Sequence, residues 1–325
     1  MMHHASKGMV PVDFPMDSLA MAAARRLAAF ESCRRDLVAL AYRMLGDVGR
    51  AEDTVQEAWL RWERYPVEAD SPKAYLVTIV TRLCLTELQS ARVRREESRP
   101  DRLPEPVDLD ESGMARVEQL EQISMAFLVV LQRLTPAERA VLLLHDVFDF
   151  EHGEIADLVG KNATACRKLL ERARHHLAEG RRMLTAAPPN EHRRMLQAFL
   201  AAASAGDVHA LVELLADDAT MITDGGVGGR KVGRVRNLPR PLHGPARIAA
   251  FVAATAKITG NSLQIEEHDL NGQPAIVFWN EDRPFAALLL AVAGGKIQGV
   301  FFHGDRERLR YLGRRSGRAA FSSSR

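Results

Sequence analysis

Through the first 184 residues, apolar side chains recur every three to four positions, which is the spacing of amphipathic helices. The first predicted helix begins near Met21, after an irregular segment that contains two prolines. Its apolar face consists of Leu37, Leu40, Ala41, Met44 and Leu45. Glycines at 46 and 49 interrupt the pattern. Further helical segments are predicted over residues 51–65, 72–95 and 116–184.

Two helix starts have clear capping signals. Asp70-Ser71-Pro72 offers capping side chains followed by a proline, whose fixed φ suits the first helical turn. Thr135-Pro136-Ala137-Glu138 is a stronger signal, because the threonine and the glutamate can each accept a hydrogen bond from the other's backbone amide. We therefore expect a helix to begin at Pro136.

After Pro188-Pro189 the pattern changes. Residues 191–216 still read as one or two helices with a turn at Gly206-Asp207, and residues 245–257 as another helix. Around them lie short apolar or alternating runs punctuated by glycine, asparagine and proline, as in β-strands. These runs cover 219–223, 263–268, 275–279, 285–292 and 296–303. The predicted fold class is therefore multidomain: two all-α domains followed by an α+β domain.

Changes in composition set the predicted domain limits. The segment 98–115 is rich in proline and acidic residues, which is typical of a linker. A basic, serine-rich tail ends the chain and is expected to be disordered. The predicted units are helical domains over 21–97 and 116–186, an α+β domain over 190–313 and a tail over 314–325.

The composition excludes several classes of protein. Hydrophobic residues make up 46% of the chain and charged residues 26%, as in ordinary globular proteins. The net charge is only +2, so any nucleic-acid-binding surface must be local. The three cysteines are scattered, and no apolar run is long enough for a membrane span. We expect a cytoplasmic protein without metal, cofactor or membrane contact, monomeric when free.

The second predicted helix carries a polar and acidic stripe beside tryptophans. Its members share one helical face, because they are spaced at i, i+3, i+4 and i+7. They are Asp53, Gln56, Glu57 and Leu60. Such a stripe suits docking onto a basic partner, although a solvated face over a tryptophan-anchored core explains the spacing equally simply.

The third predicted helix interleaves an aromatic residue and threonines with basic residues. Such a surface can hold phosphates and stack an unpaired base. The candidate DNA-binding residues are Tyr75, Thr78, Arg82, Arg92, Arg94 and Arg95. The alternative is a buried helix whose cationic end complements the helix dipole.

Residues 155–174 have the pattern of a helix-turn-helix. Ala156 is small where a second helix must cross closely, Gly160 falls at the turn, and a basic helix follows. Base edges are read from the start of such a helix. The candidate DNA-binding residues are Asn162, Thr164, Ala165, Arg167, Lys168, Arg172 and Arg174. A plain helical hairpin with a solvated basic face is the alternative.

Taken in order, these three segments resemble the extracytoplasmic-function (ECF) RNA polymerase sigma factors. Residues 36–65 are similar to the core-binding part of sigma region two, and residues 71–96 to its promoter-melting, minus-ten-reading part. Residues 134–174 are similar to region four, which reads the minus-thirty-five element. Tyr75 and Thr86 stand where the family usually has tryptophan and aspartate. The resemblance implies a non-enzymatic initiation factor that binds core RNA polymerase and promoter DNA, without a cofactor.

The remaining motifs resemble a subgroup of these factors that has a SnoaL-like C-terminal domain, a curved sheet wrapped by helices into a cone. Leu103, Pro104, Glu105 and Pro106 match the subgroup's linker motif. The resemblance implies that the domain modulates sigma activity in cis. The implied regulatory residues are Asp224, Gly225 and Gly226 in a loosened glycine-rich motif, and His303 and Asp305 in a diverged C-terminal one.

Two other functions were weighed. SnoaL-like relatives include enzymes, and the residues for acid–base catalysis here would be Asp224, His243, His268 and His303. A helix-turn-helix repressor with a sensory domain would not need the polymerase-docking helix. For the sigma factor, a small apolar ligand inside the cone is a further candidate partner.

Overall fold

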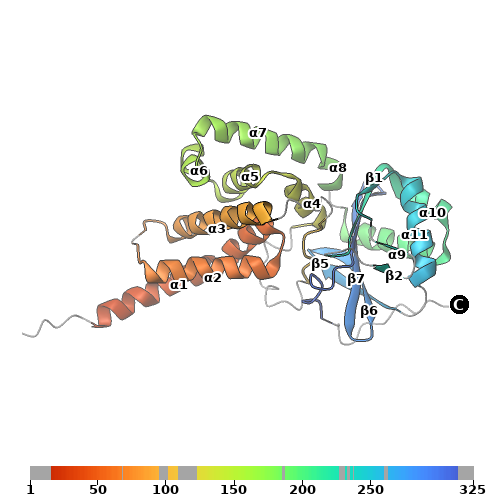
Figure 1. Cartoon of the computed structure of the whole chain (residues 1–325), viewed down its shortest axis with the longest axis horizontal. Helices are drawn as coiled ribbons and strands as arrows, with labels where there is room; N and C mark the ends of the chain where they lie inside the picture. Colours follow the sequence, from red (N-terminus) through yellow and green to blue (C-terminus); the bar gives the residue numbers. More distant parts are fainter. Residues whose placement is uncertain are drawn as a thin grey trace, which may run out of the picture.

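The computed structural model describes residues 16–67, 69–94, 102–108, 123–184, 187–226, 231–232, 235–236, 238–259 and 263–313. The helices of the first 184 residues lie at one end of the molecule, and a β-sheet lies at the other end with the remaining helices (Figure 1). The predicted tail 314–325 and most of the predicted linker fall outside these residues. Among the helices described, none combines the length and the hydrophobicity that crossing a membrane requires.

The first three helices form one bundle: α1 (Met16–Leu45), α2 (Val48–Arg64) and α3 (Pro72–Arg94). Two predicted starts are wrong by a few residues. α1 is already helical at Met16, five residues before the predicted start. α2 begins at Val48 because the Asp47 side chain accepts a hydrogen bond from the amide of Arg50. This cap outweighs the roughly 1 kcal/mol cost of Gly49 within the helix.

Five helices follow: α4 (Met125–Arg133), α5 (Pro136–Phe148), α6 (His152–Val159), α7 (Ala163–Glu179) and α8 (Arg181–Leu184). The predicted capping box at Thr135 and Glu138 is confirmed. The predicted helix-turn-helix is also confirmed, with Gly160 in the left-handed conformation at the end of α6 and Asn162 capping α7. Residue 123 and the capping Ser124 are not helical, although the predicted segment included them.

The C-terminal domain, residues 187–313, is an α+β unit, as predicted. Its helices are α9 (Pro189–Ala205), α10 (Val208–Leu214) and α11 (Pro245–Thr259). Its six-stranded sheet has the order β4-β1-β8-β7-β6-β5, and all neighbours are antiparallel except β1 and β8. The strands are β1 (Leu215–Asp224), β4 (Leu242–His243), β5 (Gln264–Leu270), β6 (Gln273–Asn280), β7 (Arg283–Ala293) and β8 (Lys296–His303). A separate hairpin joins β2 (Lys231–Val232) and β3 (Val235–Arg236).

The two faces of the sheet are covered by different parts of the chain. Because side chains alternate along a strand, Ile276 and Leu288 pack under α9, α10 and α11, whereas Val277 and Leu289 face the opposite way. That second face belongs to a core that also contains residues of the linker and of α4. The linker and α4 supply Leu103, Met125, Ala126 and Val129. The C-terminal domain therefore completes its core with the helical half of the protein.

Candidate functional site

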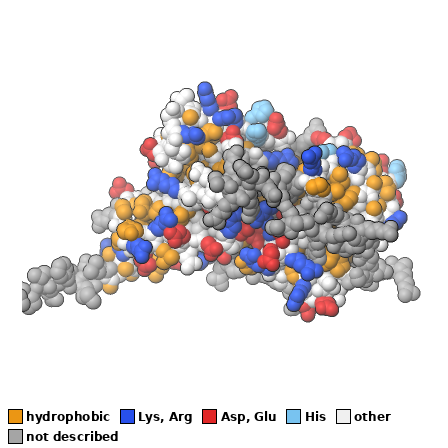
Figure 2. All heavy atoms as spheres, viewed as in Figure 1, with side chains coloured by type: hydrophobic (Ala, Val, Ile, Leu, Met, Phe, Trp, Pro, Cys, Tyr) orange, Lys and Arg blue, Asp and Glu red, His pale blue; other side chains and the backbone are white. Residues whose placement is uncertain are grey.

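The acidic stripe of α2 is open to solvent. Asp53, Gln56 and Glu57 are exposed, and 47% of Leu60 is accessible. Glu57 pairs with Arg61 one turn later at 2.7 Å. The opposite face of α2 is buried in the helical core, and hydrophobic side chains are also exposed at this end of the molecule (Figure 2). The predicted residues thus share one accessible face.

The predicted residues of α3 differ in accessibility. Tyr75 is partly buried, with its ring centroid 6.1 Å from that of Trp62. The Thr78 hydroxyl donates to the carbonyl of Ala74 at 2.9 Å, and Arg82 is exposed. The side chains of Arg92 and Arg94, and the whole of Arg95, lie outside the described residues. Of the described candidates, Arg82 is the most available to DNA.

α7 exposes a basic face along its first turns. Thr164, Arg167 and Lys168 are exposed, while Ala165 is partly buried. Lys and Arg side chains lie at the surface along this upper edge of the molecule (Figure 2). Asn162 is the cap, its side-chain oxygen accepting from the amide of Ala165 at 2.8 Å. This arrangement exposes three side chains at the N-terminal end of α7, the end from which helix-turn-helix proteins read bases.

The other two basic candidates on α7 are engaged within the helical unit. Arg172 lies 3.6 Å from the carboxylate of Glu138, and Arg174 is 2.6 Å from that of Asp146. Both arginines remain exposed on their outer sides. They suit phosphate contacts better than base readout, because their guanidinium groups are already oriented by these partners.

The two candidate DNA-binding units lie side by side. α3 packs against α5 and α6 (Figure 1). Lys73 of α3 lies over the ring of Phe148, 6.0 Å from its centroid. Arg139 of α5 is only 3% exposed, and its guanidinium donates to the carbonyls of Met44, Leu131 and Leu134. The structure is therefore a closed arrangement in which one buried cation joins α1, α4 and α5.

Linker residues 102–108 contact α1 on one side and the C-terminal domain on the other. We call these residues and their hydrogen-bonding partners the linker clamp. Tyr42 of α1 donates to the carbonyl of Glu105 at 2.6 Å. Asn271, in the β5–β6 turn, donates to the Tyr42 hydroxyl at 2.9 Å and accepts from the amide of Val107 at 3.1 Å. Asn271 has a φ of 53°, a left-handed conformation that asparagine tolerates. The clamp thus joins α1, the linker and the C-terminal domain.

The glycine-rich and C-terminal motifs meet at the same linker. The Asp224 carboxylate accepts from the amides of Leu103 and Gly226, both at 3.0 Å. Gly226 has a φ of 76°, and a Cβ there would lie 2.8 Å from the Asp305 side chain. Arg308 donates to the carbonyl of Leu103. Both motifs therefore contribute contacts to the clamp or its immediate surroundings.

A buried histidine of the sheet contacts residue 108 of the linker clamp. His268 of β5 and Asp108 both have fully buried side chains, with Nδ1 and the carboxylate 2.8 Å apart. The other ring nitrogen lies 3.4 Å from the carboxylate of Glu266. Burying charged groups is costly unless they are paired, so this contact fixes the linker against the sheet edge.

Glu105 gives the clamp a dependence on pH. Burial raises its pKa to about 7, while the hydrogen bond from the Val48 amide, 2.7 Å long, acts in the opposite direction. The folded protein therefore retains a proton that the unfolded chain releases above the ordinary glutamate pKa of 4.5. The resulting stability is complete below that value and is lost as the pH rises through about 7.

We expect a Glu105→Gln variant, which keeps the acceptor for Val48, to gain stability over the unmodified protein as the pH rises from about 6 to 8. Urea unfolding at several pH values would measure this difference. The buried His192 and His303, whose pKa values burial lowers to about 4 and about 3, affect both proteins equally. A difference that does not change with pH would contradict the assignment.

The candidates for acid–base catalysis do not form a catalytic group. Asp224 accepts a hydrogen bond from the linker amide of Leu103, and His268 pairs with Asp108. His243 lies on the edge strand β4, 3.2 Å from the hydroxyl of Thr220. Both ring nitrogens of His303 are buried without a hydrogen-bond partner among the described residues. Within those residues, no three His, Cys, Asp or Glu side chains are placed to hold a metal ion.

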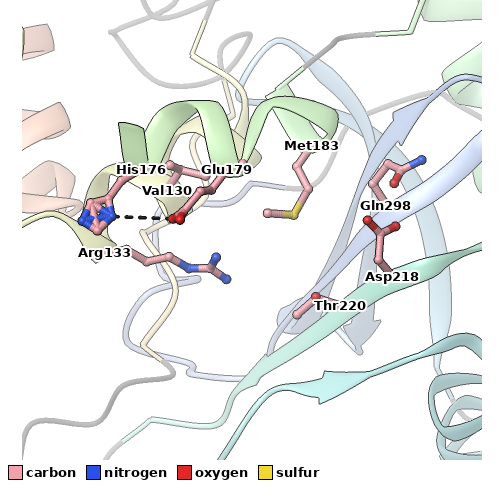
Figure 3. Close-up of a pocket in the computed structure, with 9 residues that line it drawn as sticks. Val130, Arg133, His176, Glu179, Met183, Asp218, Thr220 and Gln298 are labelled. Carbon is pink, nitrogen blue, oxygen red and sulfur yellow. Dashed lines mark ion pairs between the residues drawn. The ribbon is translucent and has the colours of Figure 1, made fainter. Parts of the chain in front are cut away.

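Two cavities lie at junctions between units. One, of about 210 Å³, separates α4, α7 and α8 from β1 and β8 (Figure 3). Its walls mix charges of both signs, with Arg133 and His176 on the helical side and Asp218 on the sheet side. The other, of about 590 Å³, lies beside the linker clamp.

Several functional contacts were missed by sequence reasoning. Tyr42, Asn271 and Arg308 all contact the linker, and Arg139 joins α5 to α1, yet none of them was a candidate. Only Asn271 had a usable signal, since Asn-Gly between two strands predicts a tight turn. The other three are distinguished by contacts with residues far away in sequence.

Comparison with known proteins places the two helical units. Sigma-70 region 2 matches residues 29–94, and sigma-70 region 4 matches residues 124–177. A probable ECF RNA polymerase sigma factor of Mycobacterium tuberculosis, SigI, is 35% identical over 279 residues, which cover 84% of this chain and 91% of the relative. The ECF RNA polymerase sigma factor SigJ of the same organism is 35% identical over 240 residues, 73% of this chain and 75% of SigJ. The crystal structure of M. tuberculosis SigJ matches with a TM-score of 0.66 and 26% identity, covering 88% of this chain and 98% of that one.

Proposed function

This chain belongs to the ECF RNA polymerase sigma factors, non-enzymatic subunits that direct RNA polymerase to promoters, and we propose that its C-terminal domain modulates that activity in cis. The observation that carries the proposal is the shared core in which linker and α4 residues cover the second face of the sheet. We also propose the domain limits 21–97, 116–186 and 190–313, action in the cytoplasm and a monomeric free state. A small apolar ligand inside the domain stays a prediction.

The closed arrangement suggests how such modulation works. The minus-ten and minus-thirty-five elements are about 25 base pairs apart, which is roughly 85 Å of duplex DNA at 3.4 Å per base pair. Helices that pack against each other cannot read both elements at once, so α3 must separate from α5 and α6 on the promoter. By holding the linker and α4, the C-terminal domain would bias the chain toward the closed arrangement.

For core polymerase we propose the α2 face of Asp53, Gln56, Glu57 and Leu60. Reversing two charges, in Asp53→Lys with Glu57→Lys, is expected to abolish co-purification with core polymerase and to leave the fold intact. The reversed side chains would carry the same charge as the basic surface of the partner, and like charges across an interface repel. Co-purification from cells and circular dichroism would measure the two effects.

The matched control reverses Glu52 and Glu63 on the same helix. Both are exposed, and both lie roughly 80–140° around the helix from Asp53 and Glu57, the two charges that the test variant reverses. This control is expected to retain core binding. If the two double variants bind core polymerase equally well, the proposed face is ordinary solvated surface.

For the minus-thirty-five element we propose Thr164, Arg167 and Lys168 on base edges, Arg172 and Arg174 on phosphates, and Asn162 and Ala165 at the start of the reading helix. Arg167→Ala or Lys168→Ala is expected to weaken promoter binding by about 1–3 kcal/mol if a base-edge contact is lost. Titration of each variant against the promoter, and against a duplex with a scrambled minus-thirty-five element, would separate base-edge contacts from phosphate contacts. An equal loss on both duplexes indicates phosphate contacts, and no loss at either position would exclude this helix from the groove.

For the minus-ten element we propose α3, with Arg82 exposed and Tyr75 and Thr78 nearer the bundle. Arg92, Arg94 and Arg95 extend this proposal along the sequence. The proposed regulatory residues are Leu103, Pro104, Glu105 and Pro106, with Asp224, Gly225, Gly226, His303 and Asp305. Contacts within the linker clamp support the first group, and the Asp224 hydrogen bond to the linker supports the second.

A further inference from the structure

We propose that the cavity beside the linker clamp binds a small molecule carrying two adjacent phosphate groups. The cavity, of about 590 Å³, lies where α2 begins, the linker passes and the segment after β8 folds back. Four of its lining residues are arginines: Arg102, Arg306, Arg308 and Arg310. A guanidinium fork binds a phosphate through two parallel hydrogen bonds, which makes such a cluster suited to phosphate esters.

The carboxylates in the same lining already have partners within the protein. One Asp47 oxygen caps α2, and the other lies 3.6 Å from Arg102 and 3.8 Å from Arg308. Glu105 accepts a hydrogen bond from an α2 amide, and Asp305 accepts one from the amide of Glu307. Glu307, the fourth carboxylate, lies 3.7 Å from Arg310. The lining carboxylates therefore engage three of the four arginines.

Two arginines keep unused donors. Arg308 is only 6% exposed, and its Nε has no hydrogen-bond partner among the described residues. A buried donor without a partner is costly, so a ligand oxygen at this position would recover free energy. Arg306 is exposed and forms no ion pair within the described part of the chain. Together, the buried guanidinium of Arg308 and the exposed one of Arg306 suit a ligand with two linked anionic groups better than a ligand with a single one.

The cavity wall also lets a ligand approach closely. Gly225 and Gly304 line it without side chains, while the space beside Gly226 is filled by the Asp305 side chain. Because the lining comes from α2, the linker and the C-terminal domain, a ligand there would contact all three at once. It would stabilise the closed arrangement by its preference for that state, and this consequence rests on the proposed cis regulation.

Calorimetric titration of the full-length protein with inorganic pyrophosphate, at constant ionic strength, tests the site. We expect saturable binding and a higher thermal unfolding midpoint. Arg306→Gln is expected to weaken binding about tenfold, the equivalent of about 1.4 kcal/mol. Arg247→Gln, at an exposed arginine on α11, and Arg167→Gln, on the DNA-reading α7, are charge-matched controls that should bind normally.

Titration with ADP distinguishes the source of the phosphates. Tighter binding than that of pyrophosphate would identify a nucleoside diphosphate, and equal binding a free diphosphate group. No saturable binding, or binding that Arg306→Gln leaves unchanged or Arg167→Gln weakens equally, overturns the proposal. If pyrophosphate binds as expected but removing the C-terminal domain leaves transcription unchanged, the site stands and the proposed cis regulation fails.

Discussion

A chain that ends at Pro188 is expected to transcribe from its promoter about tenfold more per folded molecule than the full-length chain. Tenfold corresponds to a shift of about 1.4 kcal/mol in the closed–open equilibrium, less than a few lost hydrogen bonds supply. The truncation removes Asn271 and Asp224 from the linker clamp and uncovers the α4 residues of the shared core. Run-off transcription with core polymerase, normalised to the fraction of chain that binds core, would measure the effect.

The truncated chain exposes apolar side chains of the linker and α4, so a full-length variant is needed as well. Asn271→Ala removes the hydrogen bonds to Tyr42 and Val107 but leaves the sheet in place. It should raise transcription in the same direction by a smaller factor. Unchanged transcription in both proteins would mean that the domain does not regulate. A decrease in both would mean that it holds a productive geometry instead.

Replacing Arg139 with methionine is expected to lower the free energy of unfolding by about 2–4 kcal/mol, because the carbonyls of Met44 and Leu134 lose a buried donor. Among the described residues, the cation is held by carbonyls at the C-terminal ends of α1 and α4, where the helix dipoles favour positive charge. Burial nevertheless lowers the pKa of Arg139 to about 10, so the guanidinium stays charged at neutral pH. Methionine keeps much of the apolar volume.

Urea unfolding would measure this loss, and small-angle scattering would show whether the chain becomes more extended. Arg133→Met is the matched control, since Arg133 is an exposed arginine at the end of α4. Its expected effect is within about 0.5 kcal/mol. If the two variants are equally stable, the buried cation does not hold the closed arrangement together.

Local sequence determined most of the elements. The capping box at Thr135 and the turn glycine at 160 act on neighbouring residues, so their effects are legible in the sequence. The alternating runs predicted the long strands for the same reason. The start of α2 was predicted three residues late because a single cap at Asp47 overrode the glycine that follows it.

The tertiary structure decided which elements pack against one another and which distant residues come into contact. Both faces of β6 and β7 are apolar, and the sequence cannot say that one face packs under the domain's own helices and the other against the linker and α4. Arg139 looks like an ordinary helical arginine until the ends of α1 and α4 converge on it. Asn271 and Tyr42 are 229 positions apart, and only folding brings them within hydrogen-bonding distance. The family and its helix-turn-helix follow from short-range patterns, whereas the closed arrangement and the linker clamp depend on long-range packing, which no local pattern encodes.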